Sequence, residues 1–218
     1  MIQSVKDLNN IFKAIDSKAT NKISAYLIGG GALMQFGLKG LTKDIDLVVK
    51  SKKEYDFLYS IVKLLGYKET ALTDGINRLA ISAALQKEDA RIDMFLDKIC
   101  GKMSFSSTMI PRAKIFFEGK NFSVFTASLE DIFVFKTITD REGDKADCEA
   151  IIRQSPNWNT ILDEIHKQAK KGEQVWLTYI NERLLEFESK GYSIPILKQI
   201  EKDAEEYYKK LEKKFAKK

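Results

Sequence analysis

The segment LIGGGALMQFGLKGLTKDIDLVV, residues 27–49, carries the strongest structural information in this chain. A short apolar run ends in three successive glycines at residues 29–31. Thirteen residues separate the second glycine from Asp44, and Asp46 follows two positions later. Glycines that link a strand to a helix let backbone N–H groups approach phosphate oxygens without a Cβ in the way. Paired carboxylates attract a hard cation such as Mg²⁺. The two features together predict a site for a metal-bound nucleotide.

The two aspartates lie in a run that alternates between acidic and apolar residues, which predicts a β-strand over residues 44–49. Residues two apart on a strand point to the same face, so Asp44 and Asp46 project together while Ile45 and Leu47 face the core. Two carboxylates about 7 Å apart on one strand repel each other unless a cation lies between them. An exposed strand face with two acids is the alternative interpretation of this pattern.

A third carboxylate favours the metal site. Residues 90–96, ARIDMFL, form a second predicted strand, and Asp93 lies on its polar face. If this strand is a neighbour of the first, Asp93 completes a cluster of three acids, with Asp97 as the alternative third member. Such a cluster holds two metal ions about 4 Å apart, an arrangement that serves both the attacking and the leaving oxygen in phosphoryl-type displacement.

The spacing Ile28-Gly29-Gly30, thirteen residues, then Asp44-Ile45-Asp46-Leu47 resembles the signature of the DNA polymerase β-like nucleotidyltransferase superfamily. The resemblance covers about residues 24–96. It implies an α+β fold, a minimal palm with a mixed sheet flanked by helices, followed by an all-helical part. It further implies transfer of a nucleoside monophosphate from an NTP such as ATP to a hydroxyl acceptor, with release of pyrophosphate. The implied catalytic metal ligands for two Mg²⁺ ions, or Mn²⁺ in their place, are Asp44, Asp46 and Asp93. The implied nucleotide-binding residues around them are Gly29, Gly30 and Gly31.

A closer resemblance is to the small prokaryotic branch that includes the abortive-infection type nucleotidyltransferase toxins. Thr42, two residues before the first aspartate, is typical of that branch, and so is the segment FKTITDREGDKADCEAI at residues 135–151. The resemblance implies that Thr42 and Lys136 contact the nucleotide. Asp144 then competes with Asp93 for the role of third acid. The accessory residues at the rim of the site, or in an ordinary ion-pair pattern on a helix, are Arg141, Asp144 and Asp147.

The order of predicted elements divides the chain into a catalytic domain at 1–127 and an all-helical domain at 128–218. Capping patterns place helix starts at Ser51, with Glu54 three residues later, and at Ser128, with Asp131 three residues later. The predicted strands are 24–28, 44–49, 78–85, 90–96, 114–117 and 122–126. The predicted helices are 4–18, 31–36, 51–65, 128–139, 143–154, 157–170, 173–189 and 194–215.

Charge is concentrated at the end of the chain. Residues 207–218 contain six lysines and one glutamate, so their net charge of +5 equals that of all 218 residues. Such a lysine-rich end, or basic tail, is either a solvated, solubilising surface or a contact with RNA or a partner protein. Its aromatic residues Tyr207, Tyr208 and Phe215 either stack on bases or, as the helical spacing favours, fasten the last helix to the body.

The remaining composition excludes several classes. No apolar run is long enough to span a membrane, and the first residues have no signal-peptide core, so we expect a cytoplasmic protein without a membrane partner. Two cysteines and one histidine are too few for a disulfide framework, a zinc site or a histidine-rich phosphohydrolase site. The rival function is a non-catalytic protein that binds a nucleotide or a partner, as in a toxin–antitoxin-like pair. The acceptor class stays open among RNA, a protein hydroxyl and a small hydroxylated molecule.

Overall fold

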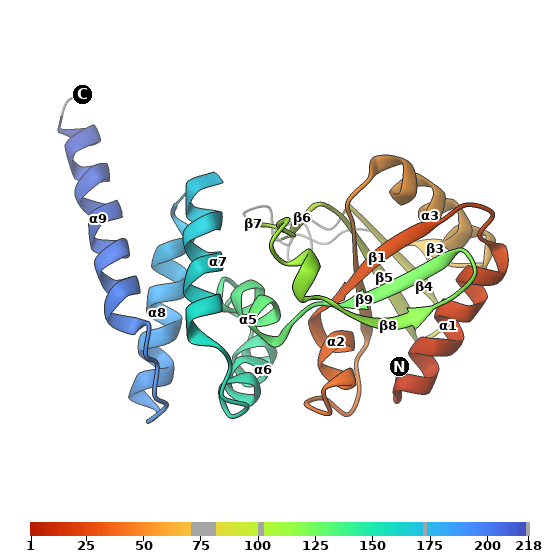
Figure 1. Cartoon of the computed structure of the whole chain (residues 1–218), viewed down its shortest axis with the longest axis horizontal. Coiled ribbons are helices and arrows are strands. Elements are labelled where there is room, and N and C mark those ends of the chain that lie inside the picture. Colours follow the sequence, from red (N-terminus) through yellow and green to blue (C-terminus); the bar gives the residue numbers. More distant parts are fainter. Residues whose placement is uncertain (71–81, 100–102, 172–173, 217–218) are drawn as a thin grey trace. The chain divides into compact units, whose positions relative to one another are not determined.

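The computed structural model describes residues 1–70, 82–99, 103–171 and 174–216 (Figure 1). It forms two compact units, Met1–Ile132 and Phe133–Lys218. Each unit has its own apolar core, and the first unit contains the predicted glycines at 29–31 and the aspartates Asp44, Asp46 and Asp93. The change from one unit to the other falls inside a helix, so no loop or linker separates them in the sequence.

The first unit is built on a mixed β-sheet that has seven strands in the described part of the chain, in the order β3-β4-β5-β2-β1-β9-β8. Its strands are β1 (Ile23–Ile28), β2 (Asp44–Val49), β3 (Lys68–Glu69), β4 (Ala83–Lys87), β5 (Ala90–Leu96), β8 (Lys114–Glu118) and β9 (Phe122–Thr126), with a separate small pair β6 (Lys98–Ile99) and β7 (Met103–Ser104). Its helices are α1 (Val5–Lys18), α2 (Gly29–Gln35), α3 (Lys52–Leu64) and the short 3-10 helix η1 (Ile110–Arg112), and α5 (Leu129–Thr137) runs into the second unit.

The sheet brings together strands that are distant in the sequence. β2 pairs with β1 in antiparallel and with β5 in parallel orientation, so β2 lies between them. Four apolar side chains of β2 and β5, Ile45, Leu47, Ile92 and Met94, are fully buried. Helices α1 and α3 contact each other and pack against the sheet (Figure 1). The polar residues that alternate with these core residues, among them Asp44, Asp46 and Asp93, therefore share the opposite face of the sheet.

Most predicted elements are confirmed, three of the strands with both ends as predicted: 44–49, 90–96 and 122–126. Ser51 accepts a hydrogen bond from the backbone N–H of Glu54, and Ser128 accepts one from Asp131, so both predicted helix starts are confirmed. The predicted strand 78–85 lies outside the described residues up to 81, and its remainder belongs to β4, which continues to Lys87. The strands β3, β6 and β7 were not predicted, because two-residue strands carry no periodicity.

The helix predicted at 31–36 was wrong at its start, because α2 begins two residues earlier, at Gly29. Gly29 has a φ of +63°, a left-handed conformation that glycine adopts without a steric cost. The chain therefore turns from β1 directly into the helix, and the three glycines form its first turn instead of a loop before it.

Asp16 at the end of α1 fixes the turn between β8 and β9, next to β1. Its carboxylate accepts hydrogen bonds from the backbone N–H groups of Lys120, Asn121 and Phe122, at 3.1, 2.7 and 2.8 Å. These bonds, above all the one from Asn121, lower the pKa of Asp16 below its ordinary value. The contact joins parts of the chain that are about a hundred residues apart and keeps β9 beside β1.

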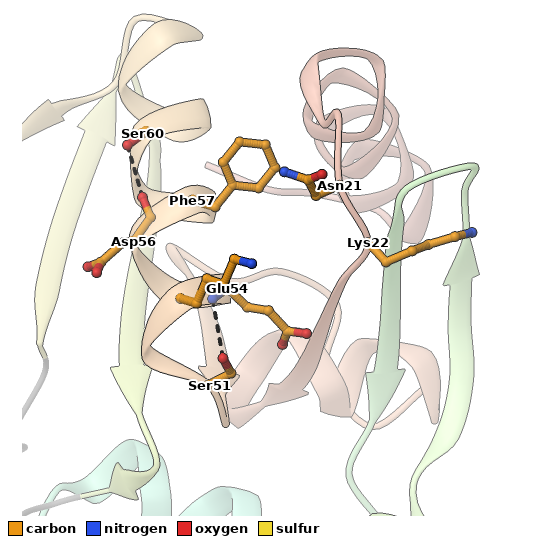
Figure 2. Close-up of a pocket in the computed structure, with 8 residues that line it drawn as sticks. Asn21, Lys22, Ser51, Glu54, Asp56, Phe57 and Ser60 are labelled. Carbon is orange, nitrogen blue, oxygen red and sulfur yellow. Dashed lines mark hydrogen bonds between the residues drawn. The ribbon is translucent and has the colours of Figure 1, made fainter.

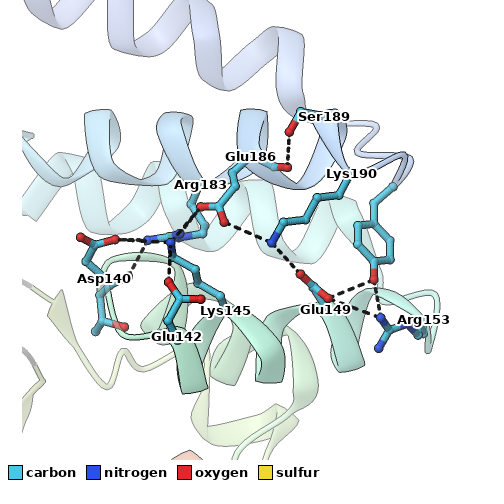
Figure 3. Close-up of polar contacts among 11 residues, drawn as sticks. Asp140, Glu142, Lys145, Glu149, Arg153, Arg183, Glu186, Ser189 and Lys190 are labelled. Carbon is cyan, nitrogen blue, oxygen red and sulfur yellow. Dashed lines mark hydrogen bonds and ion pairs between the residues drawn. The ribbon is translucent and has the colours of Figure 1, made fainter.

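The second unit is helical in its described residues. After α5 come α6 (Glu142–Ile152), α7 (Trp158–Lys171), α8 (Trp176–Ser189) and α9 (Leu197–Phe215), close to the predicted helices. Figure 3 shows polar contacts around α6 and α8. Arg183 of α8 donates to the carboxylate of Asp140, which precedes α6, at 2.8 Å. Lys190, at the end of α8, lies 3.0 Å from Glu149 of α6 and 3.2 Å from Glu186 of α8. None of the helices described is both long and apolar enough to cross a membrane.

Candidate active site

The three candidate carboxylates lie on two neighbouring strands at the centre of the sheet. Asp46 of β2 is directly opposite Asp93 of β5, and Asp44 is opposite Arg91. Residues that are paired across parallel strands, or two apart on one strand, share a face of the sheet. The side chain of Asp44 is 40% exposed and that of Asp93 is 6% exposed, so the group reaches from the protein surface into the interior. The strand pairing that a three-acid cluster requires is therefore present.

A positively charged side chain, that of Arg91, lies among these acids. The guanidinium of Arg91 donates to both oxygens of Asp93, from Nε at 2.6 Å and from Nη2 at 3.0 Å, and its Nε lies 3.8 Å from Asp44 Oδ1. Within the described ranges, no three His, Cys, Asp or Glu side chains are close enough together to hold a metal ion. The donor types and the shared face suit a divalent metal, but Asp93 is turned toward Arg91. The sequence interpretation missed this role of Arg91, although its position two residues before Asp93 places it on the same face.

The glycines pack directly against the acids. A Cβ at Gly29 would lie 2.1 Å from Asp46 Oδ2 and 2.9 Å from its Cγ, distances that no side chain tolerates. A Cβ at Gly30 would lie 2.8 Å from the hydroxyl oxygen of Thr42. The glycine motif and the aspartate motif are thus in direct contact, through Gly29 and Asp46. The missing Cβ at Gly29 leaves room for the Asp46 carboxylate.

Two other predicted nucleotide-binding residues have structural contacts. Thr42 is buried, exchanges two backbone hydrogen bonds of 3.0 Å with Ile2, and donates its hydroxyl to the carbonyl of Asp44 at 3.1 Å. It therefore fixes the chain where β2 begins. Gly31 faces inward, and a Cβ there would lie 3.2 Å from Leu27 Cδ1.

A cleft of about 350 Å³ adjoins the acids and contains Arg91 in its wall. The residues that line it are Met1, Lys43, Asp44, Gln86, Asp89 and Arg91. A larger pocket, of about 530 Å³, lies between α3 and the residues before β1 (Figure 2). Because β1 and β2 are antiparallel and Asp46 pairs with Ile28 at the end of β1, this larger pocket is at the opposite end of the strands from the acids. Of these two, the smaller cleft adjoins the candidate site, because Asp44 and Arg91 line it.

Lys136 forms a buried ion cluster in the second unit. Its Nζ lies 2.6 Å from Asp144 Oδ1 and 2.7 Å from Asp147 Oδ2. Burial pulls the pKa of Lys136 down, but the two carboxylates outweigh burial and raise the pKa above its ordinary value. Asp144 also accepts from Thr139 at 2.5 Å and from Arg141 at 2.7 Å. This cluster braces α5 against α6, and contact of Lys136 with a phosphate stays a prediction.

We expect Lys136→Met to destabilise the protein by about 3 kcal/mol, because it leaves two buried carboxylates without their shared counter-ion. Urea unfolding monitored by circular dichroism measures the loss, and Lys167→Met, which removes an exposed lysine of α7, is the control. Adding Asp144→Asn and Asp147→Asn to Lys136→Met removes the unpaired charges, so the triple variant is expected to regain part of the lost stability. A Lys136→Met variant as stable as the Lys167→Met control would contradict the bracing role.

The end of α9 differs from expectation. Tyr208 and Phe215 are 50% and 69% exposed, so these two side chains do not fasten the helix to the body. The reason is that α9 continues for more than two turns beyond Ala204, the last buried residue of this helix among those whose side chains the structure describes. The basic tail thus presents aromatic side chains to solvent.

A mixed sheet with two aspartates on one strand, a third on the parallel neighbour and a glycine turn against them has the architecture of a nucleotidyltransferase. The model of a family described as "Nucleotidyl transferase of unknown function (DUF2204)" matches residues 4–213, and the chain belongs to this family. The chain is therefore a nucleotidyltransferase, and the predicted α+β fold is confirmed. A search of curated proteins gives no match.

Among the solved structures similar to the chain are two of the same antibiotic-resistance factor. The crystal structure of ANT(2")-Ia in complex with adenylyl-2"-tobramycin has 12% sequence identity and a TM-score of 0.51, with 77% of this chain and 97% of that chain covered. The solution structure of the antibiotic-resistance factor ANT(2'')-Ia has 13% identity and a TM-score of 0.46, with 86% and 96% covered. At such identity, the crystal structure supports the fold alone.

Proposed function

We propose that this nucleotidyltransferase moves a nucleoside monophosphate from an NTP to a hydroxyl acceptor and releases pyrophosphate. The observation that carries the proposal is the cross-strand pair of Asp46 and Asp93, with Gly29 packed against the Asp46 carboxylate. Acidic side chains that share one face of two neighbouring strands form a group that suits a bound cation or a reacting group.

The roles follow from the positions of the side chains. Asp44, Asp46 and Asp93 would hold divalent metal, with two Mg²⁺ ions expected and Mn²⁺ as a substitute, and the metal would offset the charge of the triphosphate. The turn at residues 29–31 would approach the phosphates through its backbone. Asp93, beside Asp46, would take the proton of the attacking hydroxyl. Lys136 is proposed as an accessory phosphate contact, with Arg141, Asp144 and Asp147 holding its helix.

We propose two domains: a catalytic domain at 1–127 and a helical domain at 128–218. The acceptor is RNA, a protein hydroxyl or a small hydroxylated molecule. The abortive-infection resemblance and the lysine-rich end of the chain, residues 207–218, favour RNA or a partner protein. The adenylyl-tobramycin named for the similar crystal structure adds a small molecule as a candidate. We place the reaction in the cytoplasm, where nucleoside triphosphates are available.

Transfer of label from each α-³²P NTP in turn, with Mg²⁺, onto total RNA, cell protein and a panel of aminoglycosides tests the proposal. We expect one pool to be labelled from one preferred NTP, with release of unlabelled pyrophosphate. γ-³²P NTPs serve as the control, because the γ-phosphate leaves with pyrophosphate and must label none of the pools. Label from the γ-position would show phosphoryl transfer instead. No label in any pool, combined with an increase in melting temperature on addition of Mg-NTP, would favour the non-catalytic binding protein.

A further inference from the structure

Arg91 carries a charge in the candidate site that has no place in the roles given above. It lies on β5 two residues before Asp93 and directly opposite Asp44 of β2. Its guanidinium forms a bidentate contact with Asp93 and is 3.8 Å from Asp44, so it lies between the exposed and the buried acid. This is the position that a cation shared by the two carboxylates would take.

Arg91 occupies both oxygens of the Asp93 carboxylate that a metal ion would use. A planar guanidinium uses both oxygens of a carboxylate at once and fixes the direction of that carboxylate. A divalent ion on Asp93 would lie close to the guanidinium, and like charges at that separation repel each other strongly when water is partly excluded. The side chains of Asp93 and Arg91 are only 6% and 21% exposed, so solvent screens this repulsion weakly.

The Arg91 side chain has an alternative position available, in the cleft that it lines. Its side chain lines the cleft of about 350 Å³ that also contains Asp44 and Asp89. Asp89 is 94% exposed and lies at the turn between β4 and β5, next to the start of β5. A guanidinium that leaves Asp93 therefore has both room and a carboxylate within the same cleft.

We propose that Arg91 and a divalent metal ion compete for Asp93, so that Arg91 is a built-in cation which the metal must displace to complete the three-acid site. This inference rests on the proposed function, because it takes the metal to bind at Asp46 and Asp93. Arg91 is a positioning residue: it keeps the Asp93 carboxylate turned toward Asp44 and leaves it for the cleft. Its presence weakens metal binding in the absence of nucleotide.

Mn²⁺ binding without nucleotide, followed by electron paramagnetic resonance of the free ion, tests the inference. Arg91→Gln is expected to tighten Mn²⁺ binding by about tenfold, because the competing charge is gone. Arg91→Lys is expected to tighten it less, since an ammonium keeps the charge but does not form the bidentate contact. Lys43→Gln is the matched control: it removes a positive charge from the wall of the same cleft, and Lys43 is exposed.

The outcomes separate this inference from the proposed function. Unchanged or weaker Mn²⁺ binding in Arg91→Gln, while Asp46→Asn abolishes binding to the otherwise native site, overturns the inference and leaves the metal site standing. Equal tightening in Lys43→Gln also overturns it, because the effect is then one of overall charge. If neither the native protein nor Arg91→Gln binds Mn²⁺, the metal site and the inference both fail. If circular dichroism shows that Arg91→Gln does not fold, Arg91→Lys decides, and unchanged binding in that variant overturns the inference.

Discussion

Asp46→Asn is expected to reduce nucleotidyl transfer by at least about 10³-fold while the protein stays folded. A carboxylate that holds the catalytic metal contributes several kcal/mol to the transition state, and each 1.36 kcal/mol corresponds to about tenfold in rate. Asparagine has the same shape, so the contact with Gly29 persists. Because Asp46 faces Asp93 across the strands, removal of one negative charge relieves a repulsion, and the free energy of unfolding is expected to stay equal or to rise.

The matched control is Asp56→Asn, which removes an exposed carboxylate from α3 that pairs with Lys52 in a surface contact. Initial rates of transfer from the preferred NTP and urea unfolding are measured on both variants. Full activity in Asp46→Asn would remove Asp46 from the catalytic group. A loss of activity that accompanies a loss of stability would show a structural role instead, which is why both measurements are made on the same samples.

The sequence predicts the local elements of this fold well because they depend on periodicity and capping. The alternation over residues 44–49 and 90–96 and the serines at the helix starts are short-range signals, and the structure confirms them. The neighbouring positions of β2 and β5 are different, since about 45 residues separate them. From the sequence, the pairing of these two strands could only be assumed, because it would place Asp93 beside Asp46 in a three-acid cluster. The structure shows that the two strands are paired.

What the sequence does not reveal is how charged side chains choose their partners. Arg91 is adjacent to the predicted cluster in the sequence, yet its bidentate contact with Asp93 depends on side-chain geometry across two strands. Lys136 was predicted from resemblance to contact phosphate, and its pairing with Asp144 and Asp147 depends on how α5 meets α6. The exposed end of α9 has the same origin: helical spacing shows which residues share a face, but not where the covering surface ends.

Gly29→Ala is expected to have the second large effect, on stability as well as activity. The left-handed φ of +63° strains any other residue by about 1 kcal/mol, and the new Cβ would lie 2.1 Å from Asp46 Oδ2. The carboxylate must move or the turn must open, so we expect a total loss of about 3 kcal/mol in the free energy of unfolding. Transfer is expected to fall with it, even at temperatures where the variant is fully folded, because Asp46 is displaced.

Gly37→Ala is the control that separates the cost of backbone strain at a positive φ from the cost of the steric clash with Asp46. Gly37 also has a positive φ, +70°, but a Cβ there meets nothing within 4 Å, so this variant is expected to lose only about 1 kcal/mol. A double-mutant cycle then isolates the contact with the aspartate. Asp46→Ala removes the two atoms nearest to the new Cβ, so the double variant Gly29→Ala/Asp46→Ala should be more stable than Gly29→Ala alone. If the two substitutions are simply additive, the glycine turn does not touch the Asp46 carboxylate, and the link between the two motifs at residues 29–31 and 44–46 is lost.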